Sequence, residues 1–186
     1  MELELSPDKI AQLARRIDRP VVLVGMMGVG KSSVGRKLAS VLHLGFIDAD
    51  EEIERAAQMS IAEMFDRFGE SYFRDGERRV IARLVDGERR IVATGGGAFT
   101  NPQTRALILE RAVVVWLDSD IEVLLERVGR KGNRPLLRQG DPRAVLTRLK
   151  AERQSAYAEA QIHVTSGPGP HNRAVGAILK GLDAWL

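Results

Sequence analysis

Short apolar runs alternate along the chain with longer segments that carry apolar residues at helical spacing. Five runs rich in aliphatic and β-branched residues predict strands, at residues 21–24, 46–47, 91–93, 113–117 and 162–164. Continuous apolar runs are typical of strands that are buried on both faces, as in a parallel sheet. The alternation therefore predicts an α/β fold: a five-stranded parallel sheet with right-handed crossovers and helices on both faces.

Between the predicted strands, apolar residues recur three or four positions apart, which places them on one face of a helix. Such faces are formed by Val34, Leu38 and Leu42, by Val80, Ile81, Leu84 and Val85, and by Ile121, Leu124, Leu125 and Val128. A further helix should begin at Ser6-Pro7-Asp8, which combines an N-cap residue with a proline in the first turn. We therefore divide the chain into an N-terminal helical extension (1–19), packed on the body of the protein, and a single domain (20–186).

Composition narrows the classes of protein that this chain can belong to. It has 186 residues, 44% of them hydrophobic and 28% charged, as expected for one ordinary globular domain. Cysteine is absent, which excludes disulfides, cysteine-ligated zinc, iron–sulfur clusters and a thiol nucleophile. The three histidines are scattered and lack the spacing of metal ligands.

Charge and hydropathy add three expectations about partners and location. The net charge is only +3 and the basic residues form no long run, so we expect no nucleic-acid partner. No apolar stretch approaches the roughly 18 residues of a membrane span. The chain begins Met-Glu-Leu-Glu-Leu, unlike a secretory signal, so the expected location is the cytoplasm.

Residues 25–32 read GMMGVGKS and match the phosphate-binding pattern G-x-x-x-x-G-K-[ST] in full. A predicted strand leads into the motif and a predicted helix leads out, which is the placement that a P-loop requires. In such a loop Lys31 lies along the β- and γ-phosphates and the Ser32 hydroxyl binds Mg²⁺. The alternative, a glycine-rich turn that binds nothing, does not explain the complete pattern in this context. The predicted ATP-binding residues here are Gly28, Val29, Gly30, Lys31, Ser32 and Ser33.

The P-loop alone does not identify the acceptor of the phosphoryl group. Large motors are excluded by the size of the chain, and no N-K-x-D string that would read guanine is present. Small kinases remain, and residues on the acceptor side must separate them.

Two aspartates, Asp48 and Asp50, stand at the end of the second predicted strand. Side chains two positions apart on a strand share a face. One carboxylate can then support Mg²⁺, while the other accepts a hydrogen bond from a substrate hydroxyl and helps to remove its proton. The alternative is that these acids cap the helix that follows from Glu51.

Two further motifs fit an anionic acceptor. Arg74 and Glu77 are three residues apart on a predicted helix, so their ion pair would fix the guanidinium; the alternative is a surface pair of little consequence. Three glycines, Gly95 to Gly97, follow the third strand, and they let a ligand approach the backbone N–H groups closely; the alternative is a loose turn.

Two other segments need interpretation. Asp118 ends an apolar run, as does the Mg²⁺-binding aspartate of many P-loop proteins, but we favour Asp118 or Ser119 as the cap of the next helix. Residues 129–140 form a basic loop bounded by glycines, which predicts a lid that closes on an anionic ligand.

Together these motifs closely resemble the shikimate kinase family. The likeness rests on GMMGVGKSSVGRKLA at 25–39, DAD at 48–50, FRDGE at 73–77, TGGGA at 94–98, NRPLL at 133–137 and R-x-x-x-Y at 153–157, in the order of the family. The family consists of small, usually monomeric kinases of the nucleoside-monophosphate-kinase type. They use ATP and Mg²⁺ to phosphorylate the 3-hydroxyl of shikimate, in the pathway to chorismate and the aromatic amino acids.

The resemblance also implies roles for individual residues. Lys31, Asp50 and Arg134 would be catalytic, with Asp50 as the candidate base that binds the shikimate hydroxyls and Arg134 as the lid arginine that reaches the transferred phosphate. Ser32 and Asp48 would hold Mg²⁺. The remaining implied roles are the shikimate carboxylate for Arg74 and Arg153, orientation of Arg74 for Glu77, the acceptor site for Gly95, Gly96 and Gly97, and adenine stacking for Arg127.

Three other functions stay open on these residues. A gluconate-type sugar-acid kinase would share the P-loop, although the aspartate pair, the glycine loop and the paired arginines argue against it. A nucleoside monophosphate kinase should read a base and a phosphate. A non-catalytic nucleotide-binding regulator would tolerate degraded motifs, and none is degraded here. The N-terminal helix departs from many family members, and residues 166–172, where the family contacts adenine, do not align residue by residue.

Overall fold

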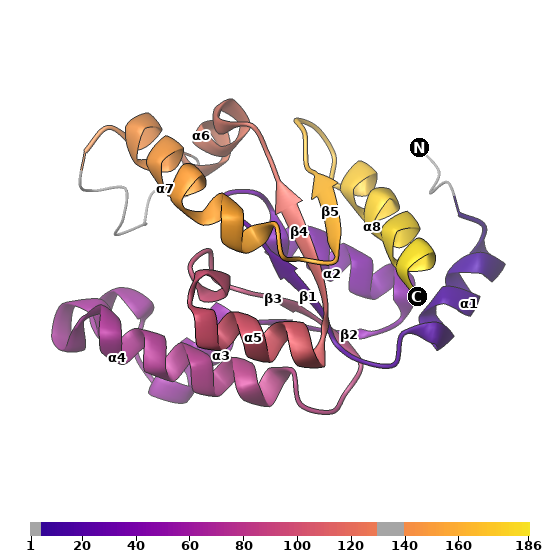
Figure 1. The fold of residues 1–186 in the computed structure, drawn as a ribbon, viewed down its shortest axis with the longest axis horizontal. Helices are drawn as coiled ribbons and strands as arrows, with labels where there is room; N and C mark the ends of the chain where they lie inside the picture. Colours follow the sequence, from indigo (N-terminus) through magenta and orange to yellow (C-terminus); the bar gives the residue numbers. More distant parts are fainter. Residues whose placement is uncertain (1–4, 130–139) are drawn as a thin grey trace.

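A computed structural model describes residues 5–129 and 140–186. Its five strands form one parallel sheet in the order β2-β3-β1-β4-β5, which confirms the predicted fold class (Figure 1). The strands are β1 (Val21–Val24), β2 (Gly45–Asp48), β3 (Arg90–Ala93), β4 (Val113–Asp118) and β5 (Ile162–Thr165). Each lies where the sequence predicts one, with ends that differ by a residue at most.

Helices connect the strands and cover both faces of the sheet. They are α1 (Pro7–Arg16), α2 (Lys31–Leu42), α3 (Ala49–Ala57), α4 (Ile61–Leu84), α5 (Pro102–Arg111), α6 (Ile121–Gly129), α7 (Pro142–Tyr157) and α8 (Asn172–Trp185), with a 3₁₀ turn η1 (Ala98–Thr100). Figure 1 shows α1, α2 and α8 on one side of the sheet and α4 and α5 on the other. Within the described residues, no helix combines the length and apolar character needed to cross a membrane.

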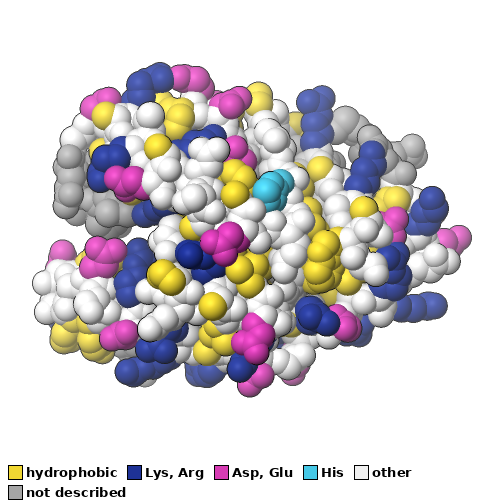
Figure 2. All heavy atoms as spheres, viewed as in Figure 1, with side chains coloured by type: hydrophobic (Ala, Val, Ile, Leu, Met, Phe, Trp, Pro, Cys, Tyr) yellow, Lys and Arg dark blue, Asp and Glu magenta, His cyan; other side chains and the backbone are white. Residues whose placement is uncertain are grey.

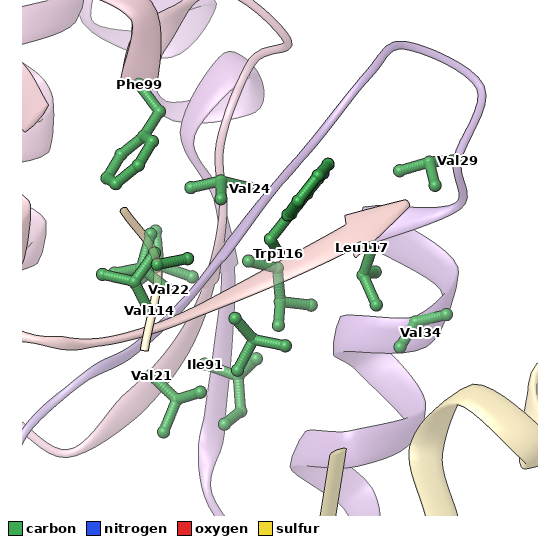
Figure 3. Packing of buried hydrophobic residues seen from close by; sticks show 14 of the residues in the cluster. Val21, Val22, Val24, Val29, Val34, Ile91, Phe99, Val114, Trp116 and Leu117 are labelled. Carbon is green, nitrogen blue, oxygen red and sulfur yellow. The ribbon is translucent and has the colours of Figure 1, made fainter. Parts of the chain in front are cut away.

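The centre of the core is the sheet itself. All four residues of β1 are fully buried, whereas β2, at one edge, is only partly buried and β5, at the other, alternates buried and exposed residues. Figure 3 shows Leu117 of β4 pointing toward Val29 and Val34, while Phe99 lies on the far side of β1. The central strands therefore read as continuous apolar runs because both of their faces are covered.

The predicted N-terminal helix is present and packs on α2 and α8. The Ser6 side chain accepts a hydrogen bond from the first turn, as an N-cap should. Its apolar side faces inward, with Leu13 and the C-cap residue Ile17 buried. Arg16 forms an ion pair with Asp183 of α8 at 2.5 Å, so the first helix is tied to the last.

Helix α4 consists of two helices that meet at a sharp kink. Gly69 lies at the break with φ 80° and ψ 174°, a backbone conformation that residues other than glycine rarely adopt. The first part begins with a capping box formed by Ser60 and Glu63. The kink redirects the second part, which carries Arg74 and Glu77 toward the sheet.

The order of the strands places a crevice above the middle of the sheet. The chain leaves β1 toward β2 on one side, and it leaves β3 toward β4 on the other side of β1. In parallel α/β sheets, ligands bind outside the carboxyl ends of strands whose connections diverge in this way. The P-loop follows β1 and the glycine loop follows β3, so both stand at this crevice.

Candidate active site

The P-loop adopts the backbone that its glycines permit. Gly25 and Gly30 have φ of 138° and 100°, and a Cβ on Gly25 would overlap the carbonyl of Leu117. Gly30 is the N-cap of α2 and provides no side-chain cap, so the first N–H groups of the helix face the loop. Lys31 is 8% exposed, and its Nζ donates to the carbonyls of Gly25 at 2.7 Å and Met26 at 3.0 Å. Such a helix start is suited to an anion.

A pocket of about 240 Å³ opens beside this loop. Its lining residues are Met27, Gly28, Gly30, Lys31, Ser32, Ser33, Asp48, Asp50, Thr94, Gly95, Gly96 and Arg127. The structure thus brings most of the predicted site residues together. Of those that it describes, Val29, Arg74, Gly97 and Arg153 do not line the pocket itself.

Asp48 caps the next helix with one carboxylate oxygen and contacts the P-loop with the other. Its Oδ1 accepts from the backbone N–H of Asp50 at 3.0 Å, which makes Asp48 the N-cap of α3. Its Oδ2 accepts from the Ser32 hydroxyl at 2.5 Å. A hydroxyl and a carboxylate in contact are ligands that Mg²⁺ uses when phosphates and water supply the rest.

The glycine loop is closely surrounded by charged side chains. A Cβ on Gly95 would lie 2.8 Å from Oδ1 of Asp50 and 3.1 Å from Oε1 of Glu77. This spacing is shorter than real Cβ contacts allow at Asp50, so glycine is required for the carboxylates to approach the backbone.

The next two glycines meet the two predicted carboxylate-binding arginines. A Cβ on Gly96 would lie 3.2 Å from the backbone nitrogen of Met27 and 3.4 Å from Nη1 of Arg153. A Cβ on Gly97 would lie 2.9 Å from Cζ of Arg74 and nearer still to Nη2. The glycine loop therefore packs tightly against the P-loop and the two arginines, and the loose-turn interpretation is wrong.

Arg74 and Glu77 form a partly buried ion pair. Nη1 of Arg74 donates to Oε2 of Glu77 at 2.6 Å, and Glu77 is 2% exposed. Burial raises the pKa of Glu77, although the charge and hydrogen bond of Arg74 oppose the shift. The surface-pair interpretation is therefore wrong for Glu77, which is buried next to the glycine loop, whereas the Arg74 side chain is 22% exposed.

Two buried atoms at this point have no hydrogen-bond partner among the described residues. They are Oε1 of Glu77 and Nη1 of Arg153. Buried polar atoms in native proteins are nearly always paired, with protein, water or ligand. A donor and an acceptor left open beside the glycine loop fit a ligand that carries both anionic oxygens and hydroxyl groups.

On the opposite side of the P-loop, Arg127 connects two loops. Its Nη1 donates to the Val29 carbonyl at 2.9 Å, and its Nη2 donates to the Gly167 carbonyl at 2.8 Å. His171 lies over the P-loop, with Cε1 3.0 Å from where a Cβ on Gly30 would stand. The pKa of His171 is lowered by burial and by the nearby charges of Arg127 and Lys37. Residues that follow β5 therefore lie against Arg127 and the P-loop.

Comparison with known proteins identifies the family. The shikimate kinase family model matches residues 27–182 of the chain. The chain belongs to the shikimate kinase family. It is similar to the shikimate kinase of Novosphingobium aromaticivorans, with 62% identity over 98% of this chain and 96% of that protein. It is also 62% identical to the shikimate kinase of Caulobacter vibrioides, over 88% of this chain and 82% of that one.

Solved structures agree with this membership of the shikimate kinase family. The shikimate kinase of Acinetobacter baumannii in complex with shikimate superposes with a TM-score of 0.86 and 34% identity, over 92% of this chain and 97% of that chain. A gluconokinase from Sinorhizobium meliloti superposes with a TM-score of 0.62 and 21% identity, over 92% of this chain and 95% of that chain. At that identity the second likeness shows a shared fold alone.

One prediction for this shikimate kinase family member is wrong. Neither Asp118 nor Ser119 caps the next helix, because α6 begins only at Ile121. Asp118 forms an ion pair with Lys150 at 2.9 Å, and the Ser119 hydroxyl donates to the Ser166 carbonyl at 2.5 Å. Both side chains therefore join β4 to elements from later in the chain, contacts that local spacing does not reveal.

One predicted residue of the family motifs is not described by the structure, and two residues without a predicted role lie at the site. Arg134 and most of the predicted lid lie outside the described residues. Sequence reasoning missed Thr94, which is buried, lines the pocket and donates its hydroxyl to the Leu23 carbonyl at 3.0 Å. It also gave no role to Tyr157, whose hydroxyl donates to the Gly96 carbonyl. Tyr157 stands in the R-x-x-x-Y motif, so a signal was present.

Proposed function

We propose that this protein transfers the γ-phosphoryl group of ATP to the 3-hydroxyl of shikimate, giving shikimate 3-phosphate on the route to chorismate. The single observation that carries this proposal is the glycine loop, with carboxylates and arginines of the acceptor side packed on it beside a P-loop. Membership of the shikimate kinase family supports the choice of acceptor. The arrangement suits a small molecule that bears one carboxylate and several hydroxyl groups.

The acceptor carboxylate is assigned to Arg74 and Arg153. Arginine offers a planar fork of N–H donors that matches a carboxylate in two-point contact. Arg74 is held in place by buried Glu77, which limits the rotamers that it can adopt. Arg153 has a buried Nη1 with no partner among the described residues, and this nitrogen can donate to the substrate. Backbone N–H groups of Gly95, Gly96 and Gly97 complete this side.

Asp50 is assigned to the reacting hydroxyl. It lines the pocket between the P-loop and the glycine loop, in the first turn of α3. Its carboxylate accepts the hydrogen bond of the hydroxyl, orients the oxygen toward the phosphate and takes the proton as the new bond to phosphorus forms. General-base assistance of this kind contributes about 10²–10⁴-fold to rate.

The nucleotide is assigned to the P-loop side. Backbone N–H groups of Gly28, Val29, Gly30, Lys31, Ser32 and Ser33 surround the phosphates, and Lys31 exchanges its carbonyl contacts for phosphate oxygens. Arg127, already fixed at the edge of the pocket, covers the adenine. Arg134 reaches the transferred phosphate from the lid, about 129–140. Ser32 and Asp48 would hold Mg²⁺. When bound, the metal ion would neutralise the charge that develops on the phosphate oxygens.

Several further properties belong to the same proposal. The protein acts as a monomer with ATP and shikimate as its partners, and it does so in the cytoplasm, where ATP is made and kept. Residues 20–186 form the catalytic domain, and residues 1–19 are an extension packed on it. No nucleic acid is involved; Figure 2 shows basic and acidic side chains interspersed over the face that it displays, without a basic stripe.

A coupled assay that follows ADP formation tests the proposal directly. Shikimate, gluconate and AMP are supplied in turn with MgATP at equal concentrations. We expect turnover with shikimate to exceed the ATP hydrolysis seen without an acceptor, and gluconate and AMP to add nothing. Preference for gluconate would support the sugar-acid kinase, and nucleotide binding without turnover of any acceptor would support a regulator.

A further inference from the structure

Tyr157, the last residue of α7, is fixed by contacts of both its hydroxyl and its ring. It is 1% exposed, and its hydroxyl donates to the carbonyl of Gly96. Its ring stacks on Trp116 of β4, with centroids 5.9 Å apart and planes inclined by 30°. The side chain therefore links the sheet and α7 to the middle of the glycine loop.

The Gly96 peptide, which this hydroxyl binds, lies between the P-loop, assigned to ATP, and Arg153, assigned to the acceptor. From Gly96, a Cβ would reach the backbone nitrogen of Met27 in the P-loop at 3.2 Å, and Nη1 of Arg153 at 3.4 Å. A movement of Gly96 of a few tenths of an ångström would change its distance to both neighbours. By binding this carbonyl, Tyr157 holds Gly96 at the place where the glycine loop lies against both the P-loop and Arg153.

Tyr157 also contacts Arg153 itself. The two residues are four positions apart on α7 and share one face of the helix. The pKa of Tyr157 is raised by burial, an effect that the charge and hydrogen bond of Arg153 oppose. The hydroxyl therefore stays protonated at neutral pH, so it acts as a hydrogen-bond donor to Gly96 and not as a base.

We infer that Tyr157 is a positioning residue on the acceptor side: its hydroxyl holds the Gly96 peptide and Arg153 in fixed relation, so that Arg153 is placed to bind the acceptor beside the P-loop. This inference rests on the proposed function. It gives the tyrosine of the R-x-x-x-Y motif a task at the acceptor side. The residue does not touch the substrate; it acts through Gly96 and Arg153.

The test replaces Tyr157 by phenylalanine, which keeps the ring on Trp116 and removes only the hydroxyl. Tyr72→Phe is a matched control, because Tyr72 is 53% exposed and undergoes the same chemical change. For Tyr157→Phe we expect kcat/KM for shikimate to fall about three- to tenfold, the usual effect of one lost neutral hydrogen bond, mainly through a higher KM. KM for ATP should stay within about twofold of the wild-type value, and Tyr72→Phe should match the wild type.

A purely structural role predicts a different result. A less stable protein has a smaller active fraction, which lowers the apparent kcat and leaves both KM values unchanged. That outcome, or unchanged constants for Tyr157→Phe, would overturn the inference. Failure of the wild-type protein to phosphorylate shikimate would instead remove the proposed function, and this inference with it.

A double-mutant cycle with Arg153→Ala examines the route of the effect. If Tyr157 acts by placing Arg153 and the peptide beside it, the hydroxyl loses much of its value once Arg153 is gone. The loss in kcat/KM for the double variant should then be smaller than the product of the two single losses. A loss equal to that product would show independent actions and would contradict the positioning role.

Discussion

Gly97→Ala should weaken acceptor binding without straining the backbone. Gly97 has φ −99° and ψ −8°, which alanine adopts readily. The added methyl would stand 2.9 Å from Cζ of Arg74, whereas ordinary contact begins at 3.4 Å, so the guanidinium must retreat by at least 0.5 Å. The free energy of unfolding should change little, because the part that moves is the end of a flexible side chain.

The expected effect on binding follows from that displacement. Arg74 is assigned to the shikimate carboxylate, and a hydrogen bond between charged groups contributes about 1.5–3 kcal/mol. Partial loss of a two-point contact should therefore raise KM for shikimate about ten- to hundredfold, since each 1.4 kcal/mol corresponds to about a factor of ten. KM for ATP should be unchanged, because the P-loop does not contact Arg74 in the described structure.

Steady-state kinetics with each substrate varied in turn provide the measurement. Gly76→Ala is the matched control: it lies in α4 two residues from Arg74, and a methyl there would meet nothing within 4 Å. We expect wild-type kinetics and slightly higher thermal stability for Gly76→Ala, because alanine favours the helix. Wild-type KM for shikimate in Gly97→Ala would refute the placement of the acceptor carboxylate at Arg74.

Three further changes test other parts of the site. Lys31→Ala should lower kcat about 10²–10³-fold, as for other lost transition-state donors, with an unchanged circular dichroism spectrum; near-normal turnover would contradict the phosphate-binding role. Asp50→Asn should lower kcat about 10²–10⁴-fold in the same assay, and a change confined to KM for shikimate would make Asp50 a binding group only. Burial raises the pKa of Glu77 above 4.5, so its contribution to the free energy of unfolding is greatest below pH 4.5 and falls as pH rises through the folded pKa. Urea unfolding from about pH 4 to pH 8 should therefore show a smaller fall for Glu77→Gln than for the wild type, and parallel curves would contradict the shift.

The architecture was largely predictable because its determinants are local. The short β-branched run from Val21 to Val24 is typical of a strand buried on both faces, and the glycine-rich loop and helix that follow can be recognised from a contiguous motif. The edge strand β2 was harder to recognise, since its exposed face tolerates polar residues. Even so, the phenylalanine and isoleucine at 46–47 were enough to locate it.

The active site was predictable in its residues and less so in its contacts. The helix-cap interpretation of Asp48 is confirmed, while its contact with the Ser32 hydroxyl depends on the tertiary approach of the P-loop, and its role toward Mg²⁺ stays a prediction. The partners of Asp118 and Ser119 come from α7 and from the end of β5, far along the chain. Tyr157 and His171 reach the site in the same way, by tertiary packing that no local pattern encodes.

The link between the first and last helices has a consequence for the order of folding. The strand made first, β1, lies in the middle of the sheet, and it can pair with β3 and β4 once residue 118 has left the ribosome. Arg16 must wait for Asp183, 167 positions later, before its ion pair can form. On the ribosome, we therefore expect the N-terminal helix to dock completely only after α8 has been made and has left the exit tunnel. Until α8 arrives, the apolar side of that helix, including Leu13, is a surface that chaperones can bind.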